Sequence, residues 1–394
     1  MKRKLNKEGY LAMNKICVYA ITKNEEQFVE QWYESMKEAD SVVVLDTGST
    51  DKTVEKLRSL GATVEVQVID PWRFDVARNE AMKLVPEDCN ILISTDLDEI
   101  LEPGWSIPLR EKWIEGVHER GVYKYSWSHL PDGSSGRIFR YDKIHSRKWL
   151  WRAPVHELLY NTETGSNLYY GENVLDLFDE VHLHHYPDQT KSRGSYLPLL
   201  ELRAKENPDD HYGLIYLAHE YYYRGKYEKS IEVLKYILGN HSDKFNSLEN
   251  ASCYLFIGDD WKELASSENN VDVKNKYYEN AIEAYKKAIK IDDSYIEPYL
   301  NLAKVLLDIE DFELAELYIK RGIKKSYRHY TWLERDTSWS YEPWDLLCLA
   351  AYYSGKKSDS IKYAAKALSF EPENSRLANN LKLCLENTND IELI

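Results

Sequence analysis

The sequence predicts two regions of different fold class, an α/β region with a Rossmann-like, mainly parallel sheet and then an all-α repeat solenoid. Up to about residue 190, short apolar runs alternate with amphipathic segments, and 10 of the 17 Gly and 7 of the 12 Pro lie there. After it, long helical patterns recur with an internal repeat. We therefore expect an N-terminal tail over residues 1–14, an α/β domain over 15–190 and a helical domain over 191–394.

The composition and charge disfavour several classes of protein. The 394 residues are 43% hydrophobic and 30% charged, which is typical of folded chains. A net charge of −15 disfavours nucleic-acid binding driven by phosphate contacts. No apolar run approaches the roughly 20 residues of a membrane helix, and no apolar segment follows the basic start as in a secretory signal. Five scattered Cys without a CxxC pair favour a reducing cytoplasm.

The first region reads as alternating strands and helices. Continuous apolar strands between amphipathic helices indicate a mainly parallel sheet that is covered on both faces. Such sheets bind ligands at the carboxyl ends of their strands, and Asn24, Asp46 and Asp96 lie at or just beyond three of those ends. Residues 122–185 mix strand-like pieces with Trp, His and Arg, and their topology is not predicted. The expected strands are 16–21, 42–45, 64–68 and 91–93, and the expected helices are 24–39, 53–60 and 75–84.

The second region contains an internal repeat of the tetratricopeptide (TPR) type. Small and turn residues recur at the required positions when the copies begin at His211, Lys262, Ile296 and Tyr341. A preceding half-repeat is expected over residues 196–206. Because such units bury their faces only by stacking, we expect one continuous solenoid with a concave binding surface.

Two carboxylates follow an apolar strand in Thr95-Asp96-Leu97-Asp98. At i, i+2 in an extended segment both face the same side, and their hard oxygens suit Mg²⁺ or Mn²⁺ bound together with substrate phosphates. The alternative is a solvated acidic loop that caps the following helix.

Two further motifs lie near the same edge. Asp46 enters the turn Asp46–Asp51, where its carboxylate could accept hydrogen bonds from a base or ribose. Helix capping by Ser49 or Asp51 is the alternative. Arg78 begins a helix and could neutralise a diphosphate, brace Asp96 or lie on the surface.

Together, Ala20–Glu25, Asp46–Asp51, Ala77–Asn79 and Asp96–Asp98 resemble the family-two glycosyltransferases of GT-A fold over about residues 15–190. The resemblance implies inverting transfer from a nucleotide-sugar. It implies that Asp46 contacts the nucleobase, and that Asp98, with Asp96, holds a divalent metal on the diphosphate. The implied nucleotide-sugar pocket contains Thr22, Asn24, Asp46, Arg78 and Asp96.

The resemblance suggests roles for residues of two later segments. Val155-His156-Glu157 resembles a segment of the subgroup that contains lipopolysaccharide-core glucosyltransferases and bacteriocin S-glycosyltransferases, which makes Glu157 the candidate general base. Pairing of Glu157 with an Arg such as Arg152 is the alternative. The Glu-Asp pair of many family members is not evident. A late His completes the metal site of the subgroup, and His184 aligns best, with His182 and His185 as alternatives and an unliganded cluster as a further one.

The expected function is a cytoplasmic, bacterial, metal-dependent glycosyltransferase. The donor would be a nucleotide-sugar such as a UDP-hexose, with Mn²⁺ or Mg²⁺ as cofactor. The acceptor would be a peptide or protein held by the repeats. The alternatives are a glycan or lipid-linked acceptor with the repeats forming a homodimer, a catalytically dead scaffold, and a nucleotidyltransferase. The sequence gives a nucleotidyltransferase little support, because it has no Gly-rich phosphate loop with a following Lys.

Overall fold

A computed structural model describes residues 14–129, 133–167, 173–188, 194 and 196–386. The chain forms two compact units, Met1–Arg203 and Ala204–Ile394. Almost all of the predicted tail over residues 1–14, and the predicted domain boundary after residue 190, lie outside the described residues.

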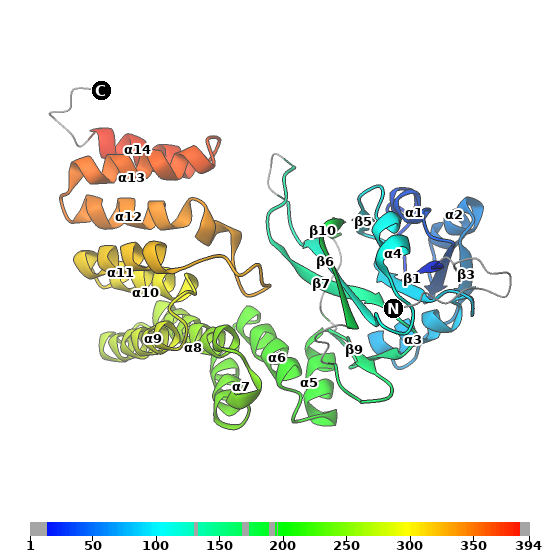
Figure 1. The fold of residues 1–394 in the computed structure, drawn as a ribbon. Helices are drawn as coiled ribbons and strands as arrows, with labels where there is room; N and C mark the ends of the chain where they lie inside the picture. Colours follow the sequence, from blue (N-terminus) through cyan, green and yellow to red (C-terminus); the bar gives the residue numbers. More distant parts are fainter. Residues whose placement is uncertain (1–13, 130–132, 168–172, 189–193, 195, 387–394) are drawn as a thin grey trace. The chain divides into compact units, whose positions relative to one another are not determined.

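An eight-stranded sheet forms the centre of the first unit, in the order β3-β2-β1-β4-β7-β6-β10-β5 (Figure 1). A separate two-stranded hairpin, β8-β9, accompanies it. The strands are β1 (Ile16–Thr22), β2 (Ser41–Asp46), β3 (Thr63–Val66), β4 (Ile91–Thr95), β5 (Glu99–Leu101), β6 (Arg120–Ser126), β7 (Ile138–His145), β8 (Trp149–Arg152), β9 (Leu158–Asn161) and β10 (Val174–His185).

The sheet is mainly parallel, as the sequence predicts. Four of its seven pairings are parallel, and the four strands β3, β2, β1 and β4 form an uninterrupted parallel half. The other half comes from the region whose topology was not predicted, and there β10 runs parallel to β6 and antiparallel to β5. The β6–β10 register shifts between Leu177 and His182, so residues 178–181 form a bulge.

Apolar side chains cover both faces of the parallel half. Along β1, Ile16, Val18 and Ala20 pack in one core cluster with residues of α1, α2 and α4. The alternate residues of β1 pack in a second cluster with α3 and the β8-β9 hairpin. This alternation places a buried layer on each side of the sheet. The helices are α1 (Val29–Met36), α2 (Thr53–Leu60), α3 (Phe74–Lys83) and α4 (Ser106–Lys112).

Helix α1 is shorter than the predicted helix over residues 24–39. It begins at Val29 because the N–H groups of residues 24–26 are bonded to the loop after β2 and to the first residue of α2 instead of forming a first turn. Asn24 itself has a φ of 54°, which is incompatible with a right-handed helix. Helix α2, in contrast, has the predicted bounds.

From residue 196 to residue 386 the chain is mainly helical. Successive helices from α6 to α14 pack against one another in a stack (Figure 1). None of the helices that the structure describes combines the length and apolar character needed to cross a bilayer. The elements are α5 (Tyr196–Glu206), α6 (His211–Tyr223), α7 (Tyr227–Asn240), η2 (Ser242–Lys244), α8 (Ser247–Ser267), α9 (Val271–Ile291), α10 (Glu297–Asp308), α11 (Phe312–Lys325), η3 (Asp336–Trp339), α12 (Glu342–Tyr353), α13 (Lys357–Phe370) and α14 (Ser375–Glu386).

Three of the four predicted repeat copies coincide with helix pairs. The copies at His211, Ile296 and Tyr341 correspond to α6-α7, α10-α11 and α12-α13, and the expected half-repeat is α5. The start of the second copy is wrong, because Lys262 lies inside α8. Helices α8 and α9 have 21 residues each, so this pair is longer than the repeat spacing assumes.

A tight contact between α8 and α9 predicts a strong effect at Gly258. A Cβ atom there would lie no farther than 2.8 Å from three ring carbons of Tyr285, which is fully buried. The ring cannot retreat easily, since its hydroxyl donates to Asp259 at 2.7 Å. We expect Gly258→Ala to destabilise the helical unit by about 1–3 kcal/mol, measured by denaturant unfolding followed by circular dichroism.

Gly239 in α7 is the matched control, because a Cβ there meets no atom within 4 Å. Gly239→Ala should leave stability unchanged or raise it by up to about 1 kcal/mol, since Ala favours a helix over Gly. Equal stability of the two variants would contradict the rigid packing of Tyr285.

Candidate active site

The predicted site residues follow neighbouring strands. In the sheet, β1 lies between β2 and β4 and is parallel to both. The register pairs Thr22 with Asp46 and Ala20 with Thr95, so the three strands end at one edge. The loops that contain Asn24, Asp46 and Asp96 therefore begin side by side, which is the usual place for a ligand site in such a sheet.

Asp46 organises its own loop. It is fully buried, and its Oδ1 accepts hydrogen bonds from the backbone N–H groups of Gly48 at 3.0 Å and Ser49 at 2.9 Å. The Ser49 hydroxyl donates to Oδ2. Both carboxylate oxygens are thus engaged within the turn, and because Asp46 is fully buried, contact with a nucleobase would require the turn to move.

Asn24 and Thr22 join the β1 loop to the β2 loop. The Oδ1 atom of Asn24 accepts from the Thr50 N–H at 2.7 Å, and the Asn24 N–H donates to the Ser49 hydroxyl at 2.8 Å. The carbonyl of Thr22 accepts from both the N–H and the hydroxyl of Thr47. The two predicted nucleotide loops therefore form one hydrogen-bonded unit.

Arg78 links three acceptors near the end of β4. Its side chain is 5% exposed, and it donates to Asp96 at 2.9 Å, to the Ser94 hydroxyl at 3.1 Å and to Glu157. The Trp151 ring lies 5.2 Å from the guanidinium carbon. Burial opposes the charge of Arg78, but Asp96 and Glu157 outweigh it and hold its pKa well above the ordinary value. Arg78 thus braces Asp96, one of the roles that the sequence suggests.

Lys143 of β7 is a site residue that sequence reasoning missed. Its Nζ lies 3.2 Å from Asp96 Oδ2 and 3.6 Å from Glu99 Oε1, and the side chain is 8% exposed. Burial would raise the pKa of Asp96, but the cations Arg78 and Lys143 lower it below its ordinary value. Burial raises the pKa of Glu99 despite Lys143. Lys143 lies in the segment whose topology was not predicted, so no sequence signal connected it with Asp96.

Asp98 faces a histidine, and that histidine is His185. The Nε2 atom of His185 lies 3.5 Å from Asp98 Oδ2, and its Nδ1 is 3.2 Å from the carbonyl of Trp127. A carbonyl at Nδ1 fixes the tautomer that leaves Nε2 directed at Asp98, as in metal-binding histidines. Burial opposes protonation of His185, but Asp98 outweighs it and raises the pKa. A carboxylate and an oriented imidazole suit Mn²⁺ and related divalent ions.

His184, the histidine that aligns best with the late His of the subgroup, points elsewhere. It shares a face of β10 with His182, and both contact Glu102, at 2.8 and 2.9 Å. The reason is the alternation of the strand, which directs consecutive residues to opposite faces. The candidate metal group of the active site is therefore Asp98 with His185 rather than with His184.

Glu157 precedes β9 in a segment with unusual backbone angles. Ala153 and His156 have φ values of 88° and 49°, which are rare for residues other than Gly. Arg203 holds the segment by donating to the carbonyls of Val155 and His156, at 3.0 and 2.7 Å. Such strain often accompanies functional sites. Glu157 does pair with an arginine, but the partner is Arg78, since Arg152 lies over the Tyr160 ring.

Comparison with known proteins identifies the two domains of the chain. Residues 17–155 match the model described as glycosyl transferase family 2, and residues 270–309 match that of the TPR repeat. An uncharacterized glycosyltransferase of Rickettsia bellii is 38% identical over 92 residues, which cover 23% of this chain and 30% of that protein. One of Rickettsia typhi is 43% identical over 61 residues, which cover 15% and 20%. The matches thus span less than a third of these relatives.

A solved structure, that of a thermophilic TPR protein of Thermus thermophilus, is similar over 48% of this chain and 89% of its own, with 19% identity and a TM-score of 0.38. The sheet architecture is that of a GT-A-like domain, and the resemblance of the sequence motifs to family-two glycosyltransferases is confirmed at the level of the family. The chain contains a glycosyl transferase family 2 domain over residues 17–155 and a TPR repeat in the helical region that follows it.

Proposed function

We propose that this protein is an inverting, metal-dependent glycosyltransferase that moves a hexose from a nucleotide-sugar, such as a UDP-hexose, to a peptide or protein acceptor. The observation that carries the proposal is the pairing of Asp98 with the oriented imidazole of His185 at the strand edge of a glycosyl transferase family 2 domain.

In this proposal Asp98 and His185 hold a divalent cation, Mn²⁺ or Mg²⁺. When bound there, such a cation would supply positive charge opposite the leaving nucleoside diphosphate. Asp96, which the sequence also assigns to the metal, has its two oxygens turned to Arg78 and Lys143. We assign Asp96 the role of fixing these two cations beside the diphosphate, where their positive field would stabilise the same negative charge.

The two bonded loops after β1 and β2 form the nucleotide side of the pocket. Thr22 and Asp46 act here by shaping the backbone, because their side chains are buried and engaged. Asn24 is exposed, so it offers a direct contact to the nucleotide.

Glu157 is the proposed general base. Arg78 engages its Oε1, whereas its Oε2 forms no hydrogen bond with other residues that the structure describes. Oε2 would take the proton from the acceptor as the acceptor atom attacks the anomeric carbon from the side opposite the diphosphate. The bond from the anomeric carbon to the diphosphate oxygen breaks in the same step, which inverts the configuration.

A groove between α7, α8 and α9 of the helical unit favours a peptide as the acceptor. The groove has a volume of about 540 Å³. It combines the aromatic rings of Tyr254 and Trp261 with the charged ends of Lys235 and Lys287. Aromatic rings with polar tips and long flexible cations suit an extended peptide.

Donor binding tests the proposal directly. We expect one nucleotide-sugar to raise the unfolding temperature of the full chain in the presence of Mn²⁺ or Mg²⁺ but not with EDTA. At a hundredfold excess over its Kd the ligand would stabilise the folded protein by about 2.7 kcal/mol. The panel should include UDP-, GDP- and dTDP-hexoses and free UDP. Absence of any shift, in folded and metal-supplied protein, would contradict the proposal.

A further inference from the structure

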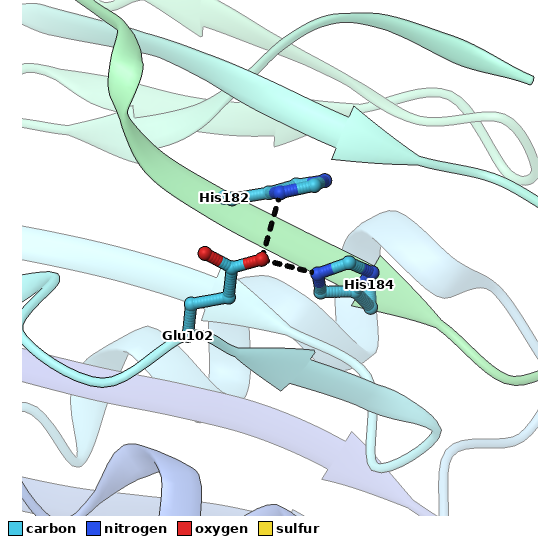
Figure 2. Close-up of side chains that lie close together, drawn as sticks. All are labelled: Glu102, His182 and His184. Atoms are coloured by element: carbon cyan, nitrogen blue, oxygen red, sulfur yellow. Dashed lines mark hydrogen bonds and ion pairs between the residues drawn. The ribbon is translucent and has the colours of Figure 1, made fainter. Parts of the chain in front are cut away.

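Three metal-ligating side chains converge at the edge of the sheet formed by β5 and β10. Glu102 follows β5, and its Oε1 lies 2.9 Å from His182 Nδ1 and 2.8 Å from His184 Nε2 (Figure 2). One ligand atom from each residue falls within 4.8 Å of the other two. Glu102 is 55% exposed at its side chain, so solvent reaches the group.

The backbone keeps these side chains together. Strands β5 and β10 are antiparallel, with Leu101 opposite Leu183, and the Glu102 N–H donates to the His182 carbonyl at 3.0 Å. His182 and His184 lie two residues apart and share one face of β10. His185 faces the other side, toward Asp98, so this group is separate from the proposed catalytic metal site.

A second layer of contacts orients both imidazoles. The Ser126 hydroxyl lies 2.7 Å from His182 Nε2, and His129 Nε2 lies 3.0 Å from His184 Nδ1. Each ring therefore has one nitrogen anchored by a neighbour while the other is turned toward Glu102. Metal-ligating histidines are oriented in this way by outer partners.

We propose that Glu102, His182 and His184 form a second metal site, which binds a divalent transition metal such as Zn²⁺. Two imidazoles and one carboxylate are a donor set that Zn²⁺ accepts in tetrahedral sites with one position open to water. Mg²⁺ prefers oxygen ligands and would not compete well. The ion would connect the end of β5 to β10. This inference does not depend on the proposed transfer reaction.

Metal titration of the EDTA-stripped full chain tests the site. Co²⁺ serves as a visible probe of tetrahedral coordination, and Zn²⁺ affinity is measured by competition with a chromophoric chelator. We expect the parent protein to bind Zn²⁺ at this site, and Glu102→Gln and His184→Ala to bind it at least about 100-fold more weakly. Ser126→Ala, which removes only an orienting partner, should weaken it by about 10- to 100-fold.

Two controls separate this site from its surroundings. Glu180→Gln removes another carboxylate of β10 and should leave Zn²⁺ affinity unchanged. Asp98→Asn should also leave it unchanged, although it would weaken metal-dependent donor binding if the proposed function is correct. No Zn²⁺ binding by the parent protein would overturn the inference, and so would unaltered affinity in both Glu102→Gln and His184→Ala. Loss of Zn²⁺ affinity in Asp98→Asn alone would place the ion at Asp98 and His185 instead.

Discussion

Arg78→Met is expected to destabilise the first unit by about 3–5 kcal/mol, because it leaves the nearly buried carboxylate of Glu157 without its cation and the partly exposed Asp96 with Lys143 alone. The guanidinium bonds to both Asp96 and Glu157, and among the residues that the structure describes only Asp96 has a second cation, Lys143. Methionine fills similar space without the charge, so the loss reports mainly on the uncompensated carboxylates. Denaturant unfolding of the full chain, followed by tryptophan fluorescence, measures the effect.

A double substitution tests the cause. Adding Glu157→Gln to Arg78→Met removes one of the stranded charges, and it should recover part of the lost stability. Arg58→Met is the control for loss of a surface arginine, since Arg58 is exposed, and it should change stability by less than about 0.5 kcal/mol. If Arg78→Met unfolds like the parent protein, the ion pairs do not determine the stability of this site.

Asp98→Asn is expected to lower the rate of metal-dependent transfer by at least about 100-fold. The amide keeps the shape of the carboxylate and a polar contact to His185, but it removes the negative charge that would hold the cation. Stabilisation of a developing charge by one preorganised group is worth about 100- to 1,000-fold in rate. Until an acceptor is known, release of nucleoside diphosphate from the nucleotide-sugar, with water as acceptor, provides the assay.

Asp88→Asn is the matched control, because Asp88 pairs with Lys15 on the surface with 60% of its side chain exposed. It should retain full activity. Glu157→Gln should behave differently from Asp98→Asn, with donor binding retained and turnover lost. Undiminished turnover in a folded Asp98→Asn protein would remove Asp98 from the proposed mechanism.

Much of the fold could be predicted from local patterns. Buried strands such as Val42–Leu45 are short and apolar, and the bounds of the helix Thr53–Leu60 follow from Asp51 before it and Gly61 after it. The helical repeat is recognisable in the sequence because small and turn residues recur at the same positions within each copy, although the spacing between copies varies. Its second copy was misplaced, because Ala281, Tyr285 and Ala288 identify the second helix of the pair but carry no information about the length of the first.

The sequence predicts which residues lie near the site better than it predicts the contacts that these residues make. Asn24, Asp46 and Asp96 lie at one edge of the sheet, since parallel strands bring their ends together, and Arg78 of α3 contacts Asp96 there. The partners of these residues depend on distant segments that carry no local signal. Lys143 reaches Asp96 across 47 positions. Glu102 meets His184 across 82 positions. A pattern of neighbouring residues cannot encode either pairing.

Because side chains alternate along β10, the geometry of two histidine sites depends on the number of residues in one segment of that strand. His185 and His184 are adjacent, and the bulge over residues 178–181 sets which of them faces Asp98. If one inserted residue moved the strand end by one position, His184 would replace His185 beside Asp98, and Leu183 would replace His184 beside Glu102. Both groups would change in a single event. Relatives that alter the length of this bulge by one residue should therefore lose or reshape both histidine sites together.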